Sequence, residues 1–241
     1  MIDIHSNEAL MVWIINRMAE LYPKNAILKG GMVLRLLDCP RYTNDLDYVF
    51  VPFSSKKEVY PLIKKLLQEL PGAKIEAAFH STSLRVSIQY QQYQTQIEVN
   101  VSKACKTEPI STSSLSKQNN QFPHIVSVMS FDVSLSNKLA AWNERGLIRD
   151  LYDIYFFHSI LKIKPDKETL KVRLKNVHSQ RKVKLPKQMT FKEFKERLMD
   201  QAKKLTQKDI DDELRDYLLL EERAGLDKKI KIALFQICEL L

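Results

Sequence analysis

Strand-forming patterns stop at about residue 132, and this uneven distribution constrains the fold more than any other feature of the sequence. The first half mixes strand patterns with helical spacing, whereas residues 132–241 show only helical spacing, interrupted at Gly146, Pro165, Pro186 and Gly225. Strands followed by a run of helices are typical of α+β proteins. We therefore expect an α+β domain over 1–131, with a mixed β-sheet and flanking helices, and a helical bundle over 132–241.

The first half contains several recognisable elements. Ser6 is a good N-cap for a helix that ends before Pro23, and apolar side chains repeat at helical spacing over 59–70. We expect a further short helix at 32–37, clear strands at 46–51, 84–88 and 97–101, and weaker strands at 74–80 and 124–129. The stretch QYQQYQ predicts a hairpin turn between two of these strands, and residues 111–121, STSSLSKQNNQ, predict a polar loop, either a mobile lid or a disordered connection.

Two aspartates stand one residue apart in the strand predicted at 46–51. The strand period of two places Asp45 and Asp47 on one face, with Leu46 pointing into the core. Paired carboxylates repel each other unless a cation lies between them, and hard oxygen ligands suit Mg²⁺ or Mn²⁺. We therefore expect a metal site, although a lone D-x-D also occurs by chance at many solvated strand ends.

A lysine and a glycine pair precede the aspartates. Gly30 and Gly31 stand at the start of the short helix, where glycine lets the backbone approach a phosphate and present its N–H groups. Lys29 adds a positive charge. Each feature alone is also common in turns and helix caps, but together with the acidic pair they predict a phosphate-binding site beside a metal.

Glu98 is the candidate for a third metal-binding carboxylate. In QIEVNV, Ile97 and Val99 face one way and Glu98 the other, so the glutamate projects from a strand that can lie beside Asp45 and Asp47. The alternative is the exposed polar face of an antiparallel strand.

A second polar cluster is expected in the helical half. Asp150 and Asp153 share a helix face, Lys138 belongs to the preceding helix, and the break at Gly146 allows the two helices to fold back on each other. Lys138 can then bind a triphosphate, while an aspartate orients it or contacts a ribose or acceptor hydroxyl. A surface ion-pair cluster is the alternative. If Lys138 binds the triphosphate, Lys138→Ala is expected to weaken NTP binding and leave the fold intact.

Positive charge is concentrated in one segment. The net charge is +9, and residues 161–209 contain 16 Lys plus Arg against 6 Asp plus Glu. Such a segment favours a polyanion partner, most often nucleic acid, although basic helical surfaces also serve solubility. The densest cluster comprises Lys171, Arg173, Lys175, Arg181, Lys182 and Lys184.

The remaining composition favours a soluble cytoplasmic protein. The three cysteines, Cys39, Cys105 and Cys238, are far apart and suggest neither a disulfide framework nor a zinc site. We expect no signal peptide and no membrane span.

These motifs resemble those of a known family. Lys29-Gly30-Gly31 followed by Asp45-Leu46-Asp47, with the later stretch NKLAAWNERGLIRDLYDIYFF, is similar to the AbiEii-type nucleotidyltransferase-like toxins of the polymerase-beta-like nucleotidyltransferase superfamily. The resemblance implies a mixed sheet with flanking helices, a helical C-terminal part, an antitoxin partner and an RNA acceptor such as a tRNA end. It assigns metal carboxylates to Asp45 and Asp47, phosphate contacts to Gly30, Gly31 and Lys138, and a further site motif to Arg149, Asp150 and Asp153.

The leading hypothesis is a metal-dependent nucleotidyltransferase that transfers NMP from an NTP to an acceptor and releases pyrophosphate. Asp45, Asp47 and Glu98 are expected to hold Mg²⁺ or Mn²⁺, and Lys29 and Lys138 to hold phosphates. One alternative is a non-catalytic, basic RNA-binding protein that retains the fold. The other is a nucleotidyltransferase acting on a small acceptor such as an antibiotic.

Overall fold

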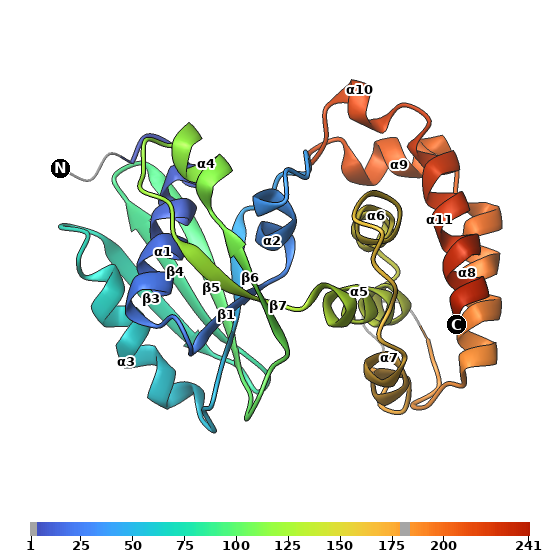
Figure 1. Cartoon of the computed structure of the whole chain (residues 1–241), viewed down its shortest axis with the longest axis horizontal. Coiled ribbons are helices and arrows are strands. Elements are labelled where there is room, and N and C mark those ends of the chain that lie inside the picture. Colours follow the sequence, from blue (N-terminus) through green and yellow to red (C-terminus); the bar gives the residue numbers. More distant parts are fainter. Residues whose placement is uncertain (1–3, 179–183) are drawn as a thin grey trace. The chain divides into compact units, whose positions relative to one another are not determined.

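The structure is a computed structural model that describes residues 4–178 and 184–241. The chain divides into two compact units, Met1–Ser130 and Phe131–Leu241, drawn from blue to green and from green to red in Figure 1. Arg181 and Lys182 of the predicted basic cluster lie outside the described residues.

The described part of the first unit contains a mixed seven-stranded sheet with the strand order β3-β4-β5-β2-β1-β7-β6. Strand β2 pairs in parallel with β5, β1 pairs in parallel with β7, and the other neighbours are antiparallel. The strands are β1 (Ala26–Lys29), β2 (Asp45–Phe50), β3 (Lys74–Phe79), β4 (Leu84–Tyr90), β5 (Tyr93–Val101), β6 (Thr107–Ser111) and β7 (Ile125–Met129).

Two long helices, α1 (Asn7–Leu21) and α3 (Lys56–Leu67), pack against the sheet and contact each other. Strand β4 shows why one sheet face is covered: Leu84, Val86 and Ile88 are buried, while the side chains between them are exposed. This alternation gives the sheet one apolar and one polar face. The short helix α2 (Gly31–Leu36) follows β1 and contacts β1 and β2.

The expected strands and helices of this unit are confirmed, including the hairpin between β4 and β5. The prediction of a loop over 111–121 is wrong, because α4 (Ser113–Gln118) occupies most of it. Asn16 of α1 explains the difference: its amide donates to the Ser116 hydroxyl at 3.0 Å, and its carbonyl accepts from the Thr112 hydroxyl at 2.8 Å. These contacts are buried and tie α4 to α1.

In the described part of the second unit, every regular secondary-structure element is a helix. Helix α5 packs against α6 and α7, α6 packs against α9 and α11, and α8 packs against α11. The breaks expected at Gly146 and Gly225 are present, and both glycines have positive φ angles. The elements are α5 (Phe131–Arg145), α6 (Ile148–Tyr155), the π-helix η1 (Phe156–Ile160), α7 (Lys167–Leu174), α8 (Phe191–Lys204), α9 (Gln207–Leu214), α10 (Leu220–Arg223) and α11 (Leu226–Leu240).

Across 4–178 and 184–241, we find no helix that combines the length and the hydrophobicity needed to span a membrane.

Candidate active site

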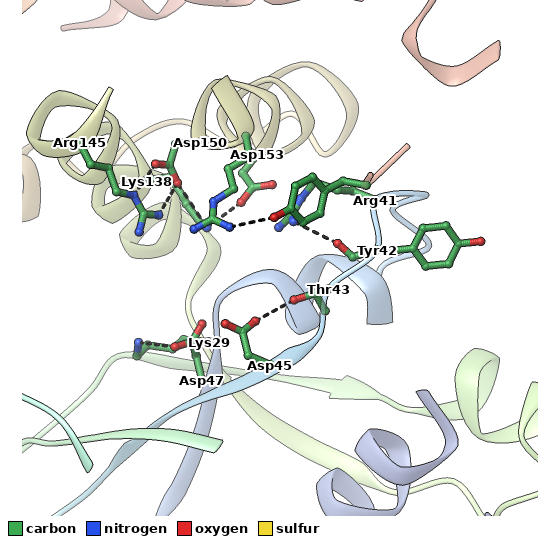
Figure 2. Close-up of polar contacts among 12 residues, drawn as sticks. Lys29, Arg41, Tyr42, Thr43, Asp45, Asp47, Lys138, Arg145, Asp150 and Asp153 are labelled. Atoms are coloured by element: carbon green, nitrogen blue, oxygen red, sulfur yellow. Dashed lines mark hydrogen bonds and ion pairs between the residues drawn. The ribbon is translucent and has the colours of Figure 1, made fainter. Parts of the chain in front are cut away.

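Strand β2 presents Asp45 and Asp47 on the polar face of the sheet, and the intervening Leu46 is fully buried on the other face. Asp45 is exposed, whereas the Asp47 side chain is 24% exposed. The strand period fixes this arrangement, because side chains two residues apart point the same way. Two carboxylates are therefore fixed side by side at the start of β2 (Figure 2).

Each of these carboxylates has a neighbouring donor. The hydroxyl of Thr43 donates to Asp45 Oδ1 at 2.9 Å, and the Lys29 ammonium lies 3.5 Å from Asp47 Oδ1. Lys29 faces Asp47 because the two residues are direct partners in the antiparallel pair of β1 and β2. These contacts orient both aspartates and place one positive charge beside the pair (Figure 2).

Two features require glycine at residue 30: its backbone conformation and the close approach of Asp47. Its φ of 78° and ψ of −154° lie in a region that is essentially restricted to glycine. A Cβ at residue 30 would lie 2.2 Å from Asp47 Oδ2, and one at Gly31 would lie 2.9 Å from the Thr43 hydroxyl oxygen. The glycine pair thus allows the backbone to pass directly beside the residues that carry and orient the carboxylates.

Glu98 lies directly opposite Asp47 in the parallel pair of β2 and β5. Its neighbour on the other side is Arg85 of β4, whose guanidinium donates to Glu98 Oε2 at 3.1 Å. One row across the sheet therefore carries Lys29, Asp47, Glu98 and Arg85, with two negative charges between two positive ones.

The aspartate pair suits a divalent cation, because it provides hard oxygen ligands from adjacent positions of one strand face. The expected trio with Glu98 is not assembled: among the described residues, no three His, Cys, Asp or Glu side chains are grouped closely enough to hold a metal. The ion pair with Arg85 engages Glu98 instead.

The second unit contains the other predicted cluster. The Lys138 ammonium of α5 lies 2.6 Å from Asp153 Oδ2 and 3.8 Å from Asp150 Oδ1. Both aspartate side chains are buried, with exposures of 1% and 0%, and the Lys138 side chain is 17% exposed. The predicted folding back of α5 and α6 is confirmed and creates this cluster (Figure 2).

Arg145 is a member of this cluster that sequence reasoning missed. Its guanidinium donates to both oxygens of Asp150 at 2.6 Å, so the pair is bidentate. The available sequence signal was an arginine just before Gly146 and an aspartate shortly after it. Arg149, which was predicted, instead points its guanidinium to the Tyr217 hydroxyl at 3.4 Å.

The basic segment is less uniform than its sequence indicates. Arg173 is only half exposed and donates to Glu144 at 2.8 Å and to Asn137 at 2.9 Å, so its charge is compensated within the fold. The side chains of Lys171, Lys175 and Lys184 are exposed.

Comparisons with solved structures identify proteins with a similar fold. The chain is similar in structure to JHP933 from Helicobacter pylori, with a TM-score of 0.56 and 18% identity over 97% of this chain and 90% of that one. It is also similar to MenT4, a nucleotidyltransferase toxin from Mycobacterium tuberculosis, with a TM-score of 0.62 and 13% identity over 98% and 83% of the two chains. A putative nucleotidyltransferase from H. pylori gives a TM-score of 0.55 and 16% identity over 97% and 93%. No curated protein matches the sequence.

These structural similarities show the fold only, whereas a match to a family model identifies the family. The model described as "Nucleotidyl transferase AbiEii toxin, Type IV TA system" matches residues 13–232, which include every site residue discussed above. The chain therefore belongs to the AbiEii nucleotidyltransferase toxin family of type IV toxin–antitoxin systems.

Proposed function

We propose that this nucleotidyltransferase transfers NMP from an NTP to a hydroxyl of an RNA acceptor, such as a tRNA end, and releases pyrophosphate. The observation that carries the proposal is the pairing of Asp45 and Asp47 on one face of β2, directly beside the glycine backbone of residue 30. The two aspartates can bind a metal ion, and the adjacent backbone, whose conformation requires glycine at residue 30, can approach a phosphate closely.

Asp45 and Asp47 would hold Mg²⁺ or Mn²⁺ in this proposal. The ion, when bound, neutralises charge on the phosphates and lowers the pKa of the attacking hydroxyl. Lys29 and the backbone at Gly30 and Gly31 bind phosphate oxygens. Glu98 remains the proposed third carboxylate, because its strand position is directly opposite Asp47. It would have to exchange its ion pair with Arg85 for the metal ion.

Lys138 is a proposed phosphate ligand, and Arg149 a further proposed nucleotide contact. Asp153 and Asp150 are both buried against the Lys138 ammonium. They therefore fit a positioning role: they hold the ammonium in place and do not reach substrate themselves. Arg145 supports Asp150 in the same way through its bidentate contact.

An RNA acceptor is supported by the exposed lysines of residues 161–209. Two backbone hydrogen bonds, from Val177 N to Lys187 O at 2.9 Å and from Met189 N to Leu174 O at 2.8 Å, bring the two ends of the most basic stretch together. Lys175, at the end of α7, and Lys187 are both exposed there. Such a group of lysines can neutralise several phosphates at once.

A labelling experiment tests the proposal. With Mg²⁺, NTPs labelled at the α-phosphate and total cellular RNA, the wild-type protein is expected to label RNA. Asp45→Asn and Asp47→Asn should each lower labelling by at least about a hundredfold, because each replaces a charged ligand by a neutral one of similar volume. Asp200→Asn is the control, since this aspartate pairs with Lys204 on the exposed side of α8. Equal labelling by all four proteins would exclude the aspartate site.

A further inference from the structure

A cleft of about 470 Å³ opens on the first unit and is lined mainly by residues of strands β3, β4 and β5. This volume falls within the range of small-ligand sites. Its strand residues include Lys74, Glu76, Ser87, Gln89, Gln94 and Gln96. The cleft has no part in the metal and phosphate sites proposed above.

The polar strand residues that line the cleft lie on the same sheet face as the acidic pair. Glu76 is the direct partner of Ser87, Ser87 of Gln96, and Gln96 of Asp45, so these four residues form one row across β3, β4, β5 and β2. Side chains in one row of a sheet project from one face. The cleft therefore begins one strand away from Asp45.

The chemistry of the cleft is polar but nearly neutral. Lys74 and Glu76 carry opposite charges, and the amides of Gln89, Gln94 and Gln96 supply both donors and acceptors. Phosphates favour positive sites, whereas the edges of nucleobases and ribose hydroxyls need donors and acceptors together. The lining therefore suits a nucleoside rather than a phosphate group.

Two of these side chains are available for such contacts. Within the described residues, the side chains of Ser87 and Gln96 have no hydrogen-bond partner. By contrast, the rim is fixed: Asn7 Oδ1 accepts from the Gln94 backbone N–H at 2.9 Å, and Asn44 O accepts from the Thr95 hydroxyl at 2.9 Å. A rigid rim around unengaged polar groups is suited to recognition.

The position of the cleft indicates which substrate it binds. The proposed phosphate contacts, Lys29 and Gly30, lie on the β1 side of Asp47, whereas the cleft lies on the β5 side of Asp45. In phosphoryl and nucleotidyl transfer, the attacking and leaving oxygens are roughly in line across the phosphorus. If pyrophosphate leaves on the β1 side, the acceptor hydroxyl approaches from the β5 side.

We infer that the cleft binds the terminal nucleoside of a single-stranded RNA acceptor and holds it beside Asp45. This inference rests on the proposed function and adds the part of the acceptor that is recognised. Specific RNA recognition commonly uses such unpaired ends, whose bases can be contacted at their edges.

The test is the binding of a fluorescein-labelled ribotetranucleotide with a free 3′-hydroxyl, without NTP or metal, followed by fluorescence anisotropy. A salt concentration of about 0.3 M suppresses contacts that depend only on phosphate charge. The double variant S87A/Q96M removes the unengaged groups from exposed or half-exposed positions. The control is Q92M, because Gln92 lies in the adjacent hairpin turn and does not line the cleft.

The double variant is expected to raise the Kd for the tetranucleotide about tenfold, while Q92M leaves it unchanged. The Kd for Mg²⁺–NTP, measured by calorimetry, should be the same for all three proteins. Weaker NTP binding with unchanged tetranucleotide binding would assign the cleft to the base of the NTP and overturn the inference. Unchanged binding of both ligands, or no binding of the tetranucleotide by the wild-type protein, would overturn it as well.

Failure of the proposed function is separable from failure of this inference. The tetranucleotide assay requires no transfer, so it can be repeated with Asp45→Asn. Retained transfer by Asp45→Asn would refute the proposed metal site, whereas only the comparison between S87A/Q96M and Q92M decides the role of the cleft.

Discussion

Gly30 lies so close to Asp47 that a Cβ at residue 30 would be 2.2 Å from the carboxylate oxygen Oδ2. The contact links the backbone before α2 to the acidic pair on β2, although the two residues are seventeen positions apart in the sequence. Because no side chain fits, the position of Asp47 depends on glycine at residue 30.

Gly30→Ala is expected to abolish most transfer and to destabilise the first unit. The added methyl group displaces the Asp47 carboxylate, and the backbone conformation alone costs about 1–3 kcal/mol for a residue other than glycine. Labelling from an α-labelled NTP and urea unfolding measure the two effects.

Gly72→Ala is the matched control, because Gly72 also has a positive φ, 79°, but nothing lies within 4 Å of its added Cβ. This variant should lose stability through its backbone and retain transfer. Equal loss of transfer in both variants would mean that strain, and not the contact with Asp47, limits activity.

Lys138→Ala is expected to destabilise the second unit, in contrast to the intact fold expected from the sequence. The Asp153 carboxylate is 1% exposed, and the ammonium is 2.6 Å from it. Removing one partner of a buried ion pair costs about 3–5 kcal/mol, because the remaining charge stays buried. Thermal unfolding of the variant should show this loss.

A double variant separates stability from nucleotide binding. Lys138→Met with Asp153→Asn removes both charges and should recover much of the stability lost in Lys138→Ala. Its Kd for Mg²⁺–NTP is nevertheless expected to rise about tenfold, because a charge-assisted phosphate contact is lost. Wild-type NTP affinity in the double variant would assign Lys138 to a purely structural ion pair.

RNA binding is expected to depend on the lysines where the ends of the basic stretch meet. Reversing the charges of Lys175, Lys187 and Lys192, all exposed, should weaken RNA binding and flatten its dependence on salt by about three units of the logarithmic slope. Filter binding at several salt concentrations measures both quantities.

The matched control reverses three exposed lysines of α3, Lys57, Lys64 and Lys65, and so changes the net charge equally. A similar loss of RNA binding in the two triple variants would show that overall charge, rather than this surface, attracts RNA.

Acid should weaken the N-terminal ends of α8 and α9. The backbone N–H and hydroxyl of Thr190 lower the pKa of Glu193, and the hydroxyl and backbone N–H of Thr206 lower that of Asp209. A carboxyl with a depressed folded pKa contributes stability above its unfolded pKa and loses it as pH falls through the folded value. The melting temperature should therefore decline from about pH 4.5 downward.

The combined variant Glu193→Gln with Asp209→Asn should show a shallower decline over the same acidic range, because it lacks the two titrating groups. Parallel curves for wild type and variant would show that other carboxylates dominate the acid response.

The sequence predicted those parts of the fold that local patterns determine. The alternation of apolar and polar residues predicted β4 and β5 and the turn between them, and the D-x-D spacing predicted that Asp45 and Asp47 share one face. It could not predict α4, because that helix depends on hydrogen bonds from Asn16 to residues about a hundred positions away. Strand β1 was missed because four residues are too few to display a period.

The candidate site, too, was predictable from the sequence only in part. The spacing of Asp150 and Asp153 predicted a shared helix face, but the bidentate contact from Arg145 depends on how the chain turns at Gly146. Likewise, Glu98 was recognised as a strand residue, whereas its position between Asp47 and Arg85 follows from the order and register of four strands. The order and register of the strands leave no local sequence signal.

The most direct test of nucleotidyl transfer compares two labels in the same NTP. Wild-type protein is incubated with Mg²⁺, RNA and either α-labelled or γ-labelled NTP, and pyrophosphate release is measured in parallel. We predict that RNA acquires the α label only, with one pyrophosphate released for each label incorporated, and that Asp47→Asn abolishes both. Transfer of the γ label, or α-label transfer that persists in Asp47→Asn, would contradict nucleotidyl transfer at the Asp45–Asp47 pair.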